Sequence, residues 1–347
     1  MTDAPVCTAL VGYGFAGRVI HAPLLAATPR LAVTDVVTAD PERAAAARAA
    51  HPGVTVHPTY DALLAATRPD LVVIASPNAA HVPQGLAAVE RGIPVVVDKP
   101  LAVTAEDGRK LVDAARSAGV PLTVFQNRRW DCEHQTLRHL RDQETLGQLI
   151  RYEARFERWR PVPKRRWREE LPSAEGGGLL MDLQSHLVDG AVDLFGPVMS
   201  VYAELSSVST VADDVAFLAL RHASGVRSHL GATSLAGAPG PRTRVLGTAG
   251  TYVVGGVDGE EAITGSSWFD ESPEQRGWLV RGEERTPVPA RPAGWAGFYP
   301  AVVEWLRGGA TVPVDPRDAV VVLDVLEAAR RSAATGETVS LSPAPAG

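Results

Sequence analysis

The chain has 347 residues, which is longer than one hydrophobic core usually supports, so we expect two domains. Hydrophobic residues make up 45% of the sequence and charged residues 21%, a globular composition without a disordered or coiled-coil bias over most of its length. The formal net charge of -6 gives no overall field that would attract nucleic acid or an anionic membrane, so we expect neither as a partner.

The cysteines and the first residues bear on redox state, metals and location. Cys7 and Cys132 form no disulfide framework or zinc signature. His134 and His139 lack metal-ligand spacing with Cys132, so we expect no metal. Residues 1–5 lack the segments of a secretory signal, and no later apolar run approaches membrane-spanning length. We therefore expect a cytoplasmic protein.

The first third of the chain alternates short runs rich in Val, Leu and Ile with Ala-rich helical segments. The runs cover residues 6–11, 31–38, 71–75, 94–97 and 122–125. Because they are apolar throughout, they are typical of parallel strands that helices cover on both faces. The sequence therefore predicts an α/β, doubly wound Rossmann domain with a parallel sheet over residues 1–126.

Residues 12–17 read G-x-G-x-x-G directly after the first predicted strand and before a predicted helix. In such a turn the first glycine permits the bend, the second lets the backbone approach a pyrophosphate, and the third lets helix and strand pack closely. A plain strand-to-helix elbow is the alternative, but the surrounding βα units favour a dinucleotide site. We expect cofactor contacts from Gly12, Gly14, Phe15, Ala16 and Gly17.

The end of the second predicted strand bears on the choice of dinucleotide. A carboxylate there would bind the ribose hydroxyls of NAD and repel the additional phosphate of NADP. The residue at this place is the neutral Thr38, and Asp40 is expected to cap the next helix. Arg43 could reach a 2′-phosphate. We therefore expect Thr38 and Arg43 to contact NADP, with NAD as the alternative.

Beyond residue 130 the pattern changes. Helices are predicted at residues 133–143, 178–195 and 317–335. Strands with alternating apolar and polar residues are predicted at 152–156, 214–220, 226–231 and 242–246, whereas residues 255–295 fit no element. This indicates an α+β domain with a mostly antiparallel sheet over residues 127–340. Its half-exposed strands favour a homo-oligomer, either a dimer or a tetramer.

Three segments carry a resemblance to a known family. They are Ser76-Pro77-Asn78-Ala79-Ala80-His81, Asp98-Lys99-Pro100, and the glycines at 176–178 that lead to Asp182 and His186. With the glycine turn, these segments resemble the motifs of the Gfo/Idh/MocA oxidoreductases, named for glucose-fructose oxidoreductase and inositol dehydrogenase. Segments 21–25, 127–131, 166–169 and 182–195 resemble the NADP-preferring scyllo-inositol dehydrogenase branch of that family.

Two residues depart from the family pattern. Asp98 stands where the family has glutamate, and Gln184 replaces the glycine between Asp182 and His186. A shorter acid would reach the nicotinamide ribose less well. Gln184 would narrow or reshape the substrate pocket.

The resemblance also implies roles for individual residues. Lys99, Asp182 and His186 would form the catalytic set and bind substrate, with His186 as the proton carrier. Cofactor contacts would come from Ser76, Pro77, Asn78, His81, Asp98, Lys99 and Arg128. For Pro77, Asn78 and His81, the alternative is that they only shape the loop and cap the next helix.

Two further contacts are hypotheses from the residues themselves. Basic runs such as residues 164–168 usually form solvated loops. A Pro-flanked loop can also fold over a cleft, and in that case Trp167 or Arg166 would contact NADP or substrate. Tyr299 is a candidate substrate contact, although aromatic side chains more often lie in a core.

The residue types suit alcohol oxidation, in which carbon loses a hydride and oxygen loses a proton. Asp182 and His186 are four residues apart, so on a helix they share one face, where the carboxylate can orient the imidazole. A histidine titrates in the useful range. Lys99, after a strand's carboxyl end, could hold the substrate oxygen and stabilise developing charge. The alternatives are that Asp182 and His186 are only a buried structural pair, and that Lys99 and Pro100 only form a turn at the end of a strand.

We therefore predict an NAD(P)-dependent dehydrogenase or reductase that acts on a polyol, sugar or related carbonyl compound. One alternative is a non-catalytic sensor of NAD(P) or sugars on the same fold, against which the intact catalytic set argues. Another is a reductase of a non-sugar ketone or imine in secondary metabolism.

Overall fold

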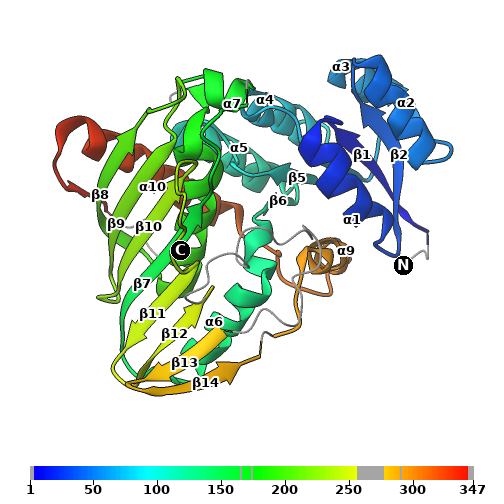
Figure 1. Cartoon of the computed structure of the whole chain (residues 1–347). Coiled ribbons are helices and arrows are strands. Elements are labelled where there is room, and N and C mark those ends of the chain that lie inside the picture. Colours follow the sequence, from blue (N-terminus) through cyan, green and yellow to red (C-terminus); the bar gives the residue numbers. More distant parts are fainter. Residues whose placement is uncertain (1–3, 165, 173–174, 256–276, 290, 343–347) are drawn as a thin grey trace. The chain divides into compact units, whose positions relative to one another are not determined.

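The computed structural model describes residues 4–164, 166–172, 175–255, 277–289 and 291–342 (Figure 1). The chain forms two compact units. The first comprises Met1–Asn127 and Trp295–Val320, and the second comprises Arg128–Gly294 and Val321–Gly347. Each unit is best understood from its own sheet.

The sheet of the first unit has six strands in the order β3-β2-β1-β4-β5-β6, and every neighbouring pair is parallel. The strands are β1 Val6–Val11, β2 Leu31–Val37, β3 Thr55–His57, β4 Leu71–Ile74, β5 Val95–Asp98 and β6 Leu122–Phe125. The chain order reverses between β1 and β4, and ligands bind such sheets beside the carboxyl ends of the strands at that point. The predicted Rossmann fold is confirmed.

The first unit contains six α-helices in its described residues, and side chains cap several of them. They are α1 Ala22–Ala26, α2 Pro41–Ala50, α3 Tyr60–Ala66, α4 Asn78–Val89, α5 Ala105–Ala118 and, later in the chain, α9 Phe298–Leu306. Thr59 and Thr104 each accept a backbone N–H three residues ahead, at 3.1 Å in both helices. These bonds satisfy donors that a helix leaves unpaired at its first turn.

The short strand β3 was not predicted. It has only three residues and lies at the edge of the sheet, where it pairs with β2. Its His57 Nε2 lies 2.7 Å from the Asp35 carboxylate of β2. A run of three residues that includes a threonine and a histidine carries no strand pattern, so the sequence alone does not reveal it.

The later segment Trp295–Val320 completes the core of the first unit. The Phe298 ring packs edge-on against Phe125 of β6, with 4.8 Å between ring centroids. The Thr123 hydroxyl, also on β6, donates to the Val314 carbonyl at 2.8 Å. The chain leaves the first unit within α10, Pro316–Thr335.

The second unit contains a nine-stranded sheet in the order β14-β13-β12-β11-β7-β10-β9-β8-β15. The strands are β7 Leu149–Glu157, β8 Val198–Ser206, β9 Val215–His222, β10 Arg227–Thr233, β11 Thr243–Gly247, β12 Gly250–Val254, β13 Gly277–Arg281, β14 Glu284–Val288 and β15 Val339–Ser340. Among the described strands of this second sheet, only the β7–β10 pair is parallel, so the predicted α+β fold with a mostly antiparallel sheet is confirmed. β13 and β14 fall in the stretch left unassigned from sequence, of which residues 256–276 and 290 lie outside the described residues.

The helices of the second unit are α6 Cys132–Asp142, α7 Trp167–Glu170, α8 Ser185–Phe195 and most of α10. The predicted helix over 178–195 is present, and Leu180–Gln184 within it form a π-helical turn. The Leu180 N–H donates to the Asp213 carboxylate at 2.6 Å, which holds the entry to this turn. Single π-helical turns are frequent at functional sites.

Candidate active site

The glycine turn of the first unit has the geometry that a dinucleotide site needs. Gly12 follows β1 with φ of 94°, and a Cβ there would lie 2.7 Å from the Ala75 carbonyl oxygen. A Cβ on Gly17 would lie 1.9 Å from the Gly12 carbonyl oxygen. Neither position accepts a side chain, whereas Gly14 has room above it. Phe15 is exposed, and Ala16 begins a π-helical turn, Ala16–His21, that leads into α1.

Arg43 lies beside this turn. Its Nη1 is 3.8 Å from the position that a Cβ would take on Gly14, and no other atom of the described residues lies within 4 Å of that position, the chain neighbours of Gly14 aside. The carboxylate of Asp40 accepts the N–H groups of Glu42 and Arg43 at 2.9 and 3.0 Å, so the predicted helix cap is confirmed. The Arg43 N–H bond in particular lowers the pKa of Asp40. Thr38, just after β2, accepts the Asp40 N–H at 3.3 Å.

The loop after β4 is tied to the loop after β5 by a buried histidine. His81 Nδ1 lies 2.8 Å from the Pro100 carbonyl oxygen, and its Nε2 lies 2.9 Å from the Ser76 carbonyl oxygen. Burial lowers the pKa of His81, while Asp98 and the two carbonyls oppose that shift. Ser76 also donates its hydroxyl to Gln84, and Pro77 precedes α4, which begins at the buried Asn78.

Asp98 ends β5 and precedes Lys99. Its Oδ1 accepts the Lys99 backbone N–H at 2.8 Å, and its Oδ2 lies 3.6 Å from His21 Nε2. Burial by itself raises the pKa of Asp98, but His21, Lys99 and His81 together bring it below its usual value. The carboxylate is therefore ionised at neutral pH.

Tyr299 lies in the core of the first unit. It sits on α9 with no exposed surface, and its hydroxyl is 2.6 Å from His21 Nδ1. This burial separates the side chain from the surface of the unit. A direct substrate contact of Tyr299 stays a prediction.

Asp182 and His186 lie together on the π-helical turn and the first turn of α8. Asp182 Oδ1 is 3.6 Å from Arg168 Nε, and the Arg168 guanidinium lies over the Trp167 ring at 4.8 Å. Trp167 and Arg168 thereby bring α7 to the Asp182 side chain. In the basic run, Arg165 lies outside the described residues, and Arg166 pairs with Glu169.

Positive charge gathers beside Asp182. Burial lowers the pKa of Arg158 to about 10, and the charges of Arg160, Arg128 and Arg242 add to this while Asp182 opposes it. The guanidinium remains charged at neutral pH. It therefore stabilises negative charge at Asp182.

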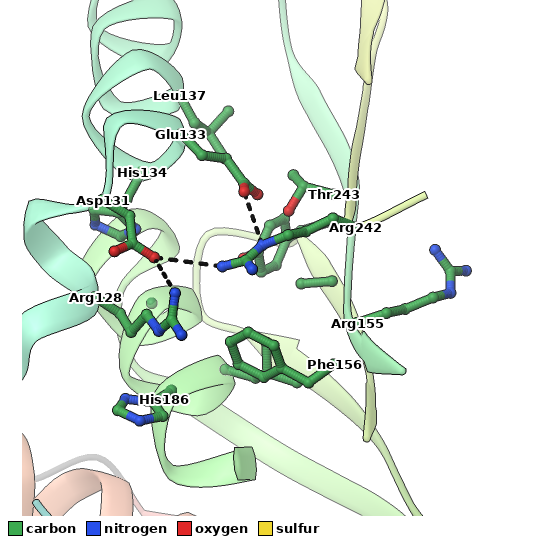
Figure 2. Close-up of a pocket in the computed structure, with 14 residues that line it drawn as sticks. Arg128, Asp131, Glu133, His134, Leu137, Arg155, Phe156, His186, Arg242 and Thr243 are labelled. Atoms are coloured by element: carbon green, nitrogen blue, oxygen red, sulfur yellow. Dashed lines mark hydrogen bonds and ion pairs between the residues drawn. The ribbon is translucent and has the colours of Figure 1, made fainter. Parts of the chain in front are cut away.

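His186 lines a small pocket in the second unit (Figure 2). Across this pocket, Asp131 accepts from Arg128 at 2.9 Å and pairs with Arg242 at 3.4 Å. Both guanidinium groups lie over the Phe156 ring, at 5.1 and 4.7 Å from its centroid. The cavity volume of about 40 Å³ holds a few water molecules, since one water needs roughly 10–15 Å³ on this measure. It is too small for a whole sugar within the second unit alone.

Sequence reasoning missed most residues of this pocket. Arg128, Asp131, His186, Leu187 and Gly190 lie in segments that resemble family motifs, and of these only Arg128 and His186 were given roles. Glu133, Phe156 and Arg242 come from α6, β7 and the residue before β11, and Glu133 pairs with Arg242 Nε at 2.9 Å. No local spacing joins residues that far apart in the chain.

Two family models match most of the chain. The model for the oxidoreductase family with an NAD-binding Rossmann fold covers residues 6–126, and that for the GFO/IDH/MocA C-terminal domain covers residues 134–253. The chain belongs to the Gfo/Idh/MocA family.

Members of the Gfo/Idh/MocA family match the chain along nearly its whole length. The oxidoreductase YdgJ of Escherichia coli is 34% identical, over 96% of this chain and 98% of its own. The scyllo-inositol 2-dehydrogenase (NADP(+)) IolW of Bacillus subtilis is 29% identical, over 96% of this chain and 95% of its own. The structure of the WlbA dehydrogenase from Bordetella pertussis, in complex with NADH and UDP-GlcNAcA, aligns with a TM-score of 0.81 at 27% identity, over 99% of this chain and 100% of WlbA.

The departure from the Gfo/Idh/MocA pattern at Gln184 has a structural explanation. The side chain is fully buried, and its Nε2 donates to the carbonyls of Ala216 and Leu230, at 3.0 Å each. Gln184 thus fastens the π-helical turn to β9 and β10. It is not among the residues that line the His186 pocket.

The described residues contain neither a helix suited to crossing a membrane nor a group of side chains suited to holding a metal ion. No described helix has both the length and the apolar character needed to cross a membrane. No group of three or more His, Cys, Asp or Glu side chains is arranged to hold a metal ion in the same part of the chain.

Proposed function

We propose that this protein is an NADP-dependent dehydrogenase or reductase that interconverts a CH–OH group and a carbonyl group on a polyol, sugar or related compound. The observation that carries the proposal lies in the first unit. Lys99 directly follows β5, at the same carboxyl edge of the parallel sheet as the glycine turn after β1. That edge is where doubly wound sheets bind dinucleotides and substrates.

The first unit fits a dinucleotide at that edge. The side-chain-free Gly12 and Gly17 and the open space at Gly14 leave room for a pyrophosphate against the backbone. The absence of a carboxylate at Thr38 and the position of Arg43 favour NADP over NAD. IolW is named as an NADP(+) enzyme, which supports the same choice. The WlbA structure holds NADH instead, so NAD is the alternative that the experiment must address.

We further propose how the remaining predicted cofactor residues act. Phe15 and Ala16 would line the entry to the glycine turn. Ser76, Pro77, Asn78 and Asp98 would form the walls contributed by the loops after β4 and β5. In the second unit, Arg128 and Trp167 would contact the cofactor.

The chemistry would divide among the chain's own residues. When bound, the nicotinamide supplies the group that accepts or donates the hydride. Lys99 would hold the substrate oxygen through its ammonium group and stabilise developing negative charge. His186 would take up and return the hydroxyl proton, because a histidine titrates near neutral pH. Asp182 would stabilise the positively charged imidazole.

A turnover screen tests this proposal. Purified protein is mixed with NADP+ or NAD+ and a panel of inositols, aldoses and aldonic acids, and with NADPH or NADH and the matching ketones; absorbance at 340 nm reports turnover. We expect turnover with a polyol or sugar, together with loss of about 10²- to 10⁴-fold in kcat for Lys99→Ala and His186→Ala. Lys110→Ala, in an exposed ion pair of α5, is the matched control.

The screen also separates the alternatives. Tight nucleotide binding without turnover of any compound would favour a sensor. Turnover of only a non-sugar ketone or imine would favour the alternative of a reductase that acts on such compounds. Full activity of both the Lys99 and the His186 variants would overturn the assigned chemistry.

We also propose that the protein is a homo-oligomer. In β9 and β10, buried residues alternate with partly exposed ones, so one face of the sheet is not fully covered within the chain. A second copy would bury that face. Sedimentation velocity should give a dimer or tetramer mass, and a monomer at micromolar concentration would contradict this.

A further inference from the structure

A fully buried histidine lies behind the predicted catalytic lysine. His21 ends the π-helical turn that follows the glycine turn, and its side chain has no exposed surface. Its Nδ1 lies 2.6 Å from the Tyr299 hydroxyl, and its Nε2 lies 3.6 Å from Asp98 Oδ2. The second distance is longer than that of a hydrogen bond. His21 therefore joins α9 to the end of β5.

The partners of His21 favour one order of protons in this chain of contacts. Asp98 is ionised and can only accept, so the His21 nitrogen that faces it carries the hydrogen. In the neutral ring Nδ1 is then an acceptor. Burial, and secondarily Asp98, raises the pKa of Tyr299 well above its usual value, so its hydroxyl keeps a proton to donate. The order is Tyr299 O–H to Nδ1, and Nε2–H toward Asp98.

The backbone on either side of Lys99 is held by a buried histidine. On the N-terminal side, the Asp98 carboxylate that faces His21 accepts the Lys99 N–H at 2.8 Å. On the C-terminal side, the Pro100 carbonyl lies 2.8 Å from His81 Nδ1. His21 and His81 thus fix the peptide groups that flank Lys99.

We propose that Tyr299 and His21 are positioning residues, which orient Asp98 and through it the backbone of Lys99. This rests on the proposed function, since it gives Lys99 a role in the reaction. Three polar groups in a core lose hydration that apolar side chains of similar size would not lose. In return they hold the carboxylate in one orientation, and a displacement of about 1 Å of a reacting group can cost on the order of 10²-fold in rate.

Substitutions at His21 separate positioning from simple packing. His21→Gln places an amide where Nε2 was, facing Asp98, whereas His21→Asn places one where Nδ1 was, facing Tyr299. Tyr299→Phe removes only the hydroxyl. His57→Gln is the matched control, because His57 is also a buried histidine and is paired with an aspartate at 2.7 Å in the sheet of the first unit, on the edge strand β3.

We expect His21→Asn to lower kcat about 10- to 100-fold, with the Kd of NADPH changed less than about threefold. His21→Gln should recover most of that loss, and Tyr299→Phe should fall between the two. His57→Gln should lose stability but keep kcat. Equal kcat for the wild type, His21→Asn and Tyr299→Phe would overturn the proposal. It would also be overturned if the kcat losses of the His21 variants only paralleled their losses of thermal stability.

A second measurement does not depend on turnover. Long-range ¹⁵N–¹H NMR of the imidazole groups, with His21 assigned by its absence in His21→Gln, reports which ring nitrogen carries the hydrogen. We expect hydrogen on Nε2 and a bare Nδ1 whose ¹⁵N shift moves in Tyr299→Phe. Hydrogen on Nδ1 alone would overturn the proposal even if the wild type is active. A wild type without activity, but with the expected tautomer, would contradict only the proposed function.

Discussion

The guanidinium of Arg43 lies 3.8 Å from the position that a Cβ atom would occupy on Gly14. A 2′-phosphate bound between the glycine turn and the end of β2 would therefore be within reach of a positive charge. We predict that Arg43→Ala raises the Kd of NADPH about 10- to 100-fold, because hydrogen bonds to charged groups contribute about 1.5–3 kcal/mol. The Kd of NADH should change less than about twofold. Titration by nicotinamide fluorescence measures both.

Arg48→Ala is the control for this prediction, since Arg48 is an exposed arginine on the same helix, α2. It should leave both nucleotides unaffected. Equal weakening of NADPH and NADH by Arg43→Ala would show that this residue does not distinguish the two.

The glycines of the turn should respond differently to alanine. A Cβ on Gly17 would meet the Gly12 carbonyl oxygen at 1.9 Å, so Gly17→Ala should destabilise the first unit by about 3 kcal/mol or more. Gly14→Ala has room and should keep the melting temperature, while its methyl group weakens nucleotide binding. Thermal unfolding and nucleotide titration separate these effects. Gly17→Ala with a wild-type melting temperature would contradict the turn geometry.

Asp193 should make stability depend on pH. Its carboxylate, on α8, lies 2.7 Å from His134 Nε2 and 2.6 Å from Arg138 Nη2, both on α6. Burial alone raises the pKa of Asp193, but His134 and the neighbouring arginines outweigh it and hold the pKa well below its usual value. A depressed carboxyl pKa adds stability that is complete above the unfolded value of about 3.9 and is lost as pH falls further.

We therefore expect Asp193→Asn to cost about 3 kcal/mol at pH 7, and progressively less below pH of about 4. Urea unfolding at several pH values measures this. Asp142→Asn, in an exposed pair with Arg141 on α6, should cost less than about 1 kcal/mol throughout. A cost for Asp193→Asn that stayed constant down to pH 3 would refute the linkage.

Gln184 should matter for stability rather than for substrate choice. Its amide donates to two strand carbonyls in the core, and an unsatisfied buried acceptor costs about 1–3 kcal/mol. Gln184→Leu should lower the free energy of unfolding by about 2–5 kcal/mol and leave the relative kcat/KM values across the substrate panel unchanged. A changed order of kcat/KM values among the substrates would show that Gln184 does shape the substrate pocket.

Local patterns in the sequence were enough to predict the parts of the fold that depend on neighbours along the chain. The apolar runs gave the principal parallel strands, the glycine spacing gave the turn at Gly12 and Gly17, and Asp40-Pro41 gave a helix cap. The helix cap and the clash between Gly17 and Gly12 follow from contacts within a few residues, and the strands follow from the composition of each run. The helix cap and the turn are steric and hydrogen-bonding requirements that only a few residue types meet.

Contacts between distant segments were not predictable in the same way. Arg242 meets Asp131 across 111 residues, and Tyr299 meets His21 across 278, so no spacing rule connects them. The π-helical turn at Leu180–Gln184 depends on Asp213 and on strand carbonyls that the helix pattern does not contain. The edge strand β3 is stabilised by β2 rather than by its own composition.

The return of Trp295–Val320 to the first unit bears on how the protein is made. A ribosome that has synthesised Asn127 must still add nearly 170 residues before Trp295 exists, which takes about 10–30 s at usual elongation rates. During that interval His21 and Phe125 lack their aromatic partners on α9. The nucleotide-binding unit is the first to emerge, yet it is finished only when most of the polypeptide has been translated.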